Sequence, residues 1–187
     1  MRHALLSFFF GAHKRRQESV HRLYEHVAYA SRNAFFYTDL AVPDTPQGRL
    51  EMLMAHTVIV LERLQQLPPP ANELSQDFVD YVFLQIDHGL REIGIGDLSV
   101  GKKIKKIAQD FYGRAALYAQ ALRDQNSDLL AQTLARNVYN AEELTTTPHV
   151  QQLAQCLIQL ANETSHLSLN DLLQAQSPVK NAHTYAT

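Results

Sequence analysis

Apolar residues recur every three to four positions along most of the chain, which is the spacing of amphipathic α-helices, and no window shows sustained strand-like alternation. Glycine and proline number seven each and cluster between these periodic segments. The pattern predicts an all-α, single-domain bundle of about six helices. The predicted helices span residues 17–38, 46–66, 75–93, 99–123, 127–139 and 148–163, and the tail could add one further turn.

The segment 46–66 is apolar nearly all round, which indicates a helix packed on both sides at the centre of the bundle. Asp44 and Thr45 before Pro46 predict its start, and the three prolines at 68–70 predict its end. His56 falls on one of its apolar stripes, so we expect a buried, hydrogen-bonded imidazole rather than a ligand.

Composition limits the possibilities further. The chain has 187 residues, 45% of them hydrophobic, and a formal net charge of -2, which suits one sizeable core rather than two. The single cysteine, Cys156, has no partner for an internal disulfide, so nothing requires an oxidising compartment. No apolar run approaches the roughly 20 residues that a membrane-spanning helix needs.

The N-terminal segment, residues 1–16, has a short apolar block followed by Lys14, Arg15 and Arg16. A secretory signal carries its charge before the apolar block, so this segment does not fit one. Phe8, Phe9 and the three cations could instead contact a membrane surface. A frayed terminus or a first core turn is the alternative. The expected organisation is this segment, a helical domain at 17–175 and a flexible tail at 176–187.

The stretch from Arg91 to Lys106 has the GxxxxGK spacing of a phosphate-binding loop, beginning at Gly96. Lys103 stands where that loop needs serine or threonine, and a helix rather than a strand precedes it. We therefore expect no nucleotide here.

The lysines of this stretch still need an explanation. A helix that starts near Ser99 would place Gly101, Lys102 and Lys103 in its first turn, where the helix dipole disfavours cations. Free amide groups, glycines and lysines at one helix start favour an anion. On a helical wheel all four lysines point away from the apolar face, and the mid-helix Gly113 lies among them, which suits close approach of another backbone or a lipid head group. An ordinary solvated face is the alternative.

Motifs for catalysis are not found. The nine histidines are scattered, without the i, i+4 pair of a zinc-binding helix, and there is no GxSxG elbow and no cysteine beside a plausible base. The sequence predicts neither an enzyme nor a metal or cofactor.

Three blocks, in order, are similar to the ubiquinol-cytochrome c chaperone family, the assembly factors for cytochrome b of the respiratory ubiquinol-cytochrome c reductase. They are residues 23–64, 90–118 and 134–139. The first contains a D-T-x-x-G-R turn formed by Asp44, Thr45, Gly48 and Arg49. The resemblance extends over about residues 20–139 and implies a helical chaperone that holds newly made cytochrome b at the membrane, without catalysis.

The resemblance and the residue chemistry together nominate two sets of positions. In the fold-specifying set, Asp44 and Arg49 could pair across the helix start or could pin the preceding loop against the body of the protein. The members of this set are Asp44, Thr45, Gly48, Arg49, His56, Asn137 and Tyr139. The expected partner-binding positions are Arg91, Gly94, Gly96, Asp97, Gly101, Lys102, Lys103, Lys105, Lys106, Tyr112, Gly113 and Arg114.

Partners and location follow as expectations. Cytochrome b is the expected partner, and a ribosome exit region or a small helical co-chaperone are further ones that the resemblance suggests. The expected location is the cytoplasmic face of a bacterial inner membrane, with the mitochondrial matrix face as the alternative. An RNA-associated module using the lysines, or a peripheral membrane protein organised by residues 1–16, are the competing functions.

Overall fold

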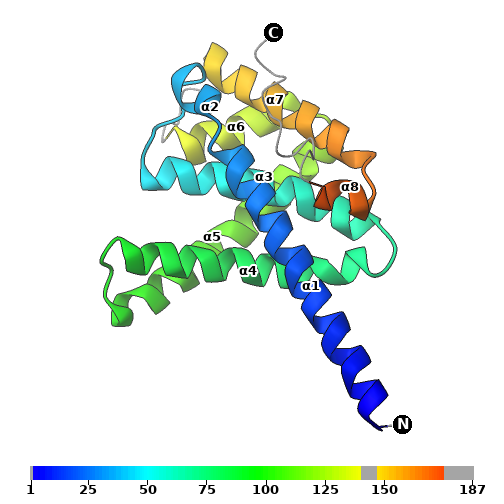
Figure 1. Ribbon diagram of the computed structural model, residues 1–187. Helices are drawn as coiled ribbons and strands as arrows, with labels where there is room; N and C mark the ends of the chain where they lie inside the picture. The colour runs from blue at the N-terminus through cyan, green and yellow to red at the C-terminus, as the bar shows by residue number, and fades with distance from the viewer. Residues whose placement is uncertain (1, 140–146, 175–187) are drawn as a thin grey trace.

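The computed structural model describes residues 2–139 and 147–174, except for the side chains of residues 2–13 and 98. These described ranges contain helices and no strand, which confirms the all-α fold (Figure 1). The helices are α1 (Arg2–Ser31), α2 (Ala34–Thr38), α3 (Pro46–Gln66), α4 (Ala71–Glu92), α5 (Asp97–Arg123), α6 (Ser127–Val138), α7 (Pro148–Ser165) and α8 (Leu169–Leu173).

Helix α3 lies at the centre of the bundle and packs against α1, α4, α5, α6 and α7. The start of this helix is where the sequence predicted it. Thr45 caps it there, since its Oγ1 accepts a hydrogen bond from the Gly48 amide at 3.1 Å. Met52, Val58 and Leu64 are among its fully buried side chains. The all-round apolar pattern of this segment therefore predicted its place correctly.

The predicted helix 17–38 is wrong in two respects. Helix α1 begins at Arg2, far before residue 17, and it ends at Ser31. Asn33 then starts α2, because its side-chain oxygen accepts a hydrogen bond from the Phe35 amide at 3.0 Å. This cap satisfies an amide that would otherwise lack a partner, and it breaks the chain into two helices.

Two other helices begin earlier than predicted. Helix α4 starts at Ala71 rather than residue 75, directly after Pro70, which occupies the N-cap position. Helix α5 starts at Asp97 rather than residue 99, with Gly96 as its N-cap. The further turn expected in the tail is α8, whose Ser168 and Asp171 form a reciprocal capping box. The expected tail 176–187 lies outside the described residues.

No helix in the described part of the chain is both long enough and apolar enough to cross a bilayer. The N-terminal part of α1 projects from the bundle, so that the N-terminus lies far from the turn between α4 and α5 (Figure 1).

Candidate partner-binding surface

The turn between α4 and α5 is built by its glycines. Gly94 has a φ of 85°, a left-handed conformation that closes α4 and that glycine adopts without steric cost. The Ile95 amide then returns to the Leu90 carbonyl at 3.1 Å, and Gly96 begins α5. None of Gly94, Gly96 and Gly101 would bring an added Cβ within 4 Å of another atom. These glycines thus serve the turn or leave open space, and do not relieve a contact within the bundle.

Arg91 and Asp97, two of the expected partner-binding positions, bind each other across this turn. Arg91 also donates to Asp87 at 2.6 Å. Asp97 occupies the first turn of α5, where a carboxylate suits the positive end of the helix dipole. Both side chains are therefore engaged in closing the hairpin.

The four lysines lie beyond the first turn of α5, because the helix begins at Asp97. The expectation that Lys102 and Lys103 meet the free amides at the helix start is therefore wrong. Lys102, Lys103 and Lys105 are exposed and make no ion pair with any described residue. Lys106 pairs with Asp110 at 3.2 Å. The lysines form an outward-facing basic patch, and the first turn is served by Asp97.

The same face of α5 continues about two turns further as an uncharged surface. Tyr112 is 56% exposed and Leu117 is 44% exposed. Gly113 is exposed between them, and an added Cβ there would meet nothing within 4 Å. Tyr112 stacks edge-on against Phe111, with ring centroids 5.4 Å apart, so its ring is held on the surface. We call this face the α5 outer face; it consists of Lys102, Lys103, Lys105, Lys106, Tyr112, Gly113 and Leu117.

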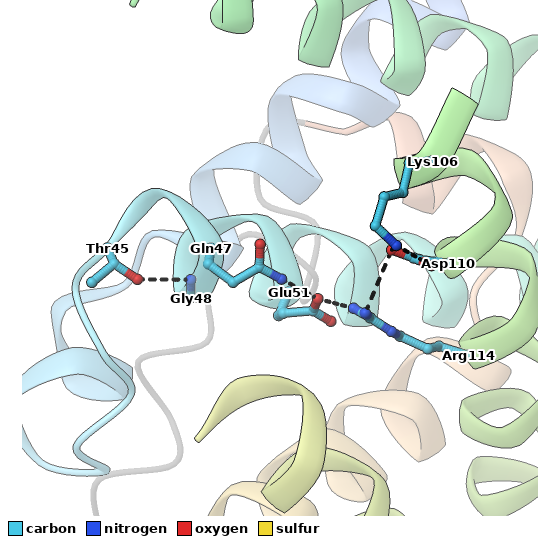
Figure 2. A network of polar contacts seen from close by, with 7 residues as sticks. All are labelled: Thr45, Gln47, Gly48, Glu51, Lys106, Asp110 and Arg114. Carbon is cyan, nitrogen blue, oxygen red and sulfur yellow. Dashed lines mark hydrogen bonds and ion pairs between the residues drawn. The ribbon is translucent and has the colours of Figure 1, made fainter. Parts of the chain in front are cut away.

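Arg114 does not belong to that surface, contrary to expectation. Its side chain turns inward and binds Glu51 of α3, whose side chain is fully buried. Figure 2 shows the resulting chain of contacts, in which Arg114 also approaches Asp110 at 3.9 Å and Asp110 contacts Lys106. Arg114 is thus a connection between α3 and α5.

Glu51 is the important residue that sequence reasoning missed. Gln47 donates to its Oε1 at 2.8 Å, and Arg114 donates to the same oxygen. Burial raises the pKa of Glu51, although Arg114 and Gln47 oppose that shift. The available signal was a charged residue inside a helix predicted to be buried on all sides, since such a residue needs a partner.

Two neutral tyrosines complete the interior near α6. Burial raises the pKa of Tyr118 above its usual range, and Asn137 and Glu51 are among the groups that act on its hydroxyl. The Tyr139 hydroxyl donates to the Leu40 carbonyl at 2.7 Å and so ties the end of α6 to the loop before α3. Asn137 and Tyr139 therefore lie in the body of the bundle, apart from the α5 outer face.

The D-T-x-x-G-R turn has a structural explanation. Arg49 donates to both carboxylate oxygens of Asp44, at 2.5 and 3.1 Å, so the two side chains pair across the start of α3. A Cβ on Gly48 would lie 2.0 Å from the Pro43 carbonyl oxygen, so only glycine fits this position. The motif fixes the loop before α3 against the start of that helix.

His56 is a buried imidazole, as predicted. Its Nδ1 lies 2.8 Å from the Met52 carbonyl oxygen, and its ring packs edge-on against Phe36. Burial lowers the pKa of His56 to about 4. The ring is therefore neutral at physiological pH. The described residues contain no group of histidine, cysteine and acidic side chains that could hold a metal ion.

The N-terminal cations differ from one another. Arg16, which was expected to contact a membrane, instead binds Asp77 and approaches Glu73 of α4. Lys14 and Arg15 are exposed. The side chains of Phe8 and Phe9 lie outside the described part of the structure. Arg16 is thus a contact between α1 and the bundle.

Comparison with known proteins decides the family. The sequence model described as ubiquinol-cytochrome C chaperone matches residues 38–179. The chain belongs to the ubiquinol-cytochrome c chaperone family. The crystal structure of the Cbp3 homolog from Brucella abortus is 37% identical, covers 90% of this chain and 92% of its own, and superposes with a TM-score of 0.78. No curated protein matches the chain.

The family match includes both features described above, the turn at the start of α3 and the hairpin between α4 and α5. It also continues past residue 139, where the resemblance seen in the sequence ended, and so includes α7 and α8. The α5 outer face thus lies on a member of a chaperone family.

Proposed function

We propose that this protein is an assembly chaperone without catalytic activity, which binds newly made cytochrome b and assists biogenesis of the ubiquinol-cytochrome c reductase. Membership of the chaperone family supports the general role. The observation that supports a binding surface concerns the α5 outer face. There Lys102, Lys103 and Lys105 are exposed and make no ion pair with any described residue. This face combines positive charge with an uncharged aromatic region.

The residues of this face lower the stability of α5 in the isolated protein. Lysines four residues apart on a helix repel each other, and a mid-helix glycine costs about 1 kcal/mol relative to alanine. Gly113 has no neighbour that requires it. A client that brings acidic groups to the lysines and an apolar helix to Gly113 and Tyr112 would offset both costs.

The proposed location is the cytoplasmic face of a bacterial inner membrane, where a newly inserted cytochrome b would be accessible. A small helical co-chaperone and the ribosome exit region are further proposed partners. Residues 1–16 are proposed to contact the membrane surface through Phe8, Phe9, Lys14 and Arg15.

The test is an affinity pull-down from detergent-solubilised membranes of respiring cells. The variant Lys103→Glu with Lys105→Glu reverses two exposed charges and spares Lys106, which is tied to the interior through Asp110. We expect this variant to recover much less cytochrome b at an unchanged melting temperature. The matched control is Arg22→Glu with Arg136→Glu, which makes the same change in net charge on exposed positions of α1 and α6.

Equal recovery of cytochrome b by the lysine variant and the wild type would exclude the α5 outer face as the client site. Recovery of ribosomes instead of cytochrome b would favour the RNA-associated alternative. A salt series identifies that case, because phosphate contacts lose affinity steeply with ionic strength.

A further inference from the structure

A groove opens on the side of the bundle where the end of α1, the start of α3 and the end of α4 meet. It encloses about 400 Å³, within the range of pockets that bind ligands. Its lining residues from α3, α4 and α5 are mostly aliphatic. They include Leu50, Leu53, Ile86, Leu90, Ile93 and Ile107.

The walls of the groove are open to solvent although they are apolar. Leu50, Leu53 and Leu90 pack on the core with one side only and remain partly exposed. Ile93, at the lip, is 64% exposed. Aliphatic surface left in water is unfavourable, so a partner that covers these side chains would gain free energy from their burial.

A glycine keeps the groove open. Gly89 lies in the last turn of α4, one turn before Ile93, and lines the groove. An added Cβ there would meet nothing within 4 Å, so the packing of the bundle does not require glycine. Glycine lowers helix stability relative to other residues. Its presence in the wall permits the close approach of another backbone.

The rim of the groove is positively charged. Arg49 is neutralised by Asp44, which it binds through both carboxylate oxygens. Arg32 also lines the groove, is exposed, and makes no ion pair with any described residue. The remaining polar lining residues, such as Gln85, are uncharged. The groove therefore presents one guanidinium group without a partner, and its complement is a carboxylate.

We propose that this groove binds one amphipathic α-helix of a partner protein, with its aliphatic face on the groove and a carboxylate on the flank that faces Arg32. The walls are helical stripes at spacings of three and four residues, which accept the side chains of another helix. The groove is lined by the C-terminal end of α1. The opposite end of that helix, the segment suited to a lipid surface, projects from the bundle (Figure 1). It does not include the exposed lysines, so this inference does not depend on where the client binds.

The experiment uses the full chain and two synthetic peptides of about 18 residues, long enough to form a helix on binding. Both have leucines on one face, and one has glutamates on its flanks where the other has lysines. Fluorescence anisotropy measures binding to the wild type, Gly89→Leu, Arg32→Glu and Gly113→Leu. Gly113→Leu is the matched control, because it replaces another helical glycine with open space around it, on the α5 outer face.

We expect the glutamate peptide to bind the wild type more tightly than the lysine peptide. Gly89→Leu should weaken that binding at least about tenfold without lowering the melting temperature, because leucine is the better helix former. Arg32→Glu should reverse the order of the two peptides, and Gly113→Leu should leave it unchanged.

Three results would overturn the inference: no binding of the glutamate peptide, equal binding of both peptides to the wild type, or unchanged binding to Gly89→Leu. Displacement of the peptide by neutral phosphatidylcholine vesicles would overturn it as well, since lipid would then be the occupant. Loss of cytochrome b capture by the lysine variant, with peptide binding intact, would separate this groove from the client site.

Discussion

Gly48 lies where the local structure leaves no room for a side chain. A Cβ there would lie 2.0 Å from the Pro43 carbonyl oxygen, which is backbone and cannot turn aside. We expect Gly48→Ala to lower the free energy of unfolding by about 1–3 kcal/mol, the usual cost of forcing an atom into a packed site. Urea unfolding followed by circular dichroism measures the difference.

The control for this prediction is Gly113→Ala, which makes the same chemical change where an added Cβ meets nothing within 4 Å. That variant should gain up to about 1 kcal/mol from helix propensity. Equal effects of the two substitutions would show that the approach of Pro43 does not determine the residue at position 48.

His56 should make stability depend on pH. Its pKa is lowered from 6.5 to about 4 by burial, so the unfolded chain binds a proton that the folded chain rejects between these values. Stability is therefore fully present above about pH 6.5 and falls as the pH drops towards 4. We expect His56 to account for a loss of about 3 kcal/mol across this window.

The pH dependence is isolated by the difference between the wild type and His56→Gln, measured by denaturant unfolding at a series of pH values. Other titrating groups, including Glu51 with its raised pKa, act in both proteins and largely cancel. Parallel curves for the two proteins would contradict the assignment to His56.

At the scale of elements, α3 and α5 are joined by the pair of Glu51 and Arg114. Arg114→Met should lower the free energy of unfolding by about 3 kcal/mol near neutral pH, because it leaves a carboxylate buried without its cation. The loss should be smaller at acid pH, where Glu51 becomes protonated and neutral. Denaturant titrations at two pH values measure both effects.

The double variant Glu51→Leu with Arg114→Met tests the same pair by removing both of its charges. Removing both charges should restore stability to within about 1 kcal/mol of the wild type, since a desolvated ion pair contributes little net free energy. A double variant as unstable as the single one would mean that packing, rather than the unpaired charge, causes the loss.

The helices were predictable where strong local signals mark their ends. Thr45, Pro46 and the three prolines after Leu67 mark the two ends of α3. Thr147 and Pro148 mark the start of α7. The break after Ser31 was missed because Asn33 acts through a side-chain cap, which periodicity does not reveal. Helix α5 begins at Asp97, two residues before the predicted start, and this difference places the lysines beyond its first turn.

The candidate site could be predicted only in part. Exposure of Lys102, Lys103 and Lys105 follows from the helical wheel alone. The inward turn of Arg114 depends on Glu51, which lies 63 residues earlier in the chain. The groove at Gly89 is lined by residues of α1, α3, α4 and α5, and only the packing of the bundle brings these together.

At the scale of the whole molecule, α1 has two parts with different surroundings. From Val20 onwards most of its apolar side chains are buried, including Leu23 and Val27, and Arg16 binds Asp77 of α4. The N-terminal part of the helix projects from the bundle (Figure 1). The sequence of this projecting part is apolar from Ala4 to Phe10, so it is the part suited to an interface outside the bundle.

Two truncations separate a membrane contact from the stability of the fold. Deletion of residues 2–13 keeps Arg16 and its contacts with α4, so we expect the melting temperature to change by no more than about 2 °C. The same deletion should reduce flotation with anionic vesicles, because it removes Phe8 and Phe9. Deletion of residues 2–16 should lower the melting temperature further, through loss of the Arg16 contacts. Undiminished flotation after the shorter deletion would place any membrane contact elsewhere, and an equal loss of stability in both would make the projecting part a member of the core.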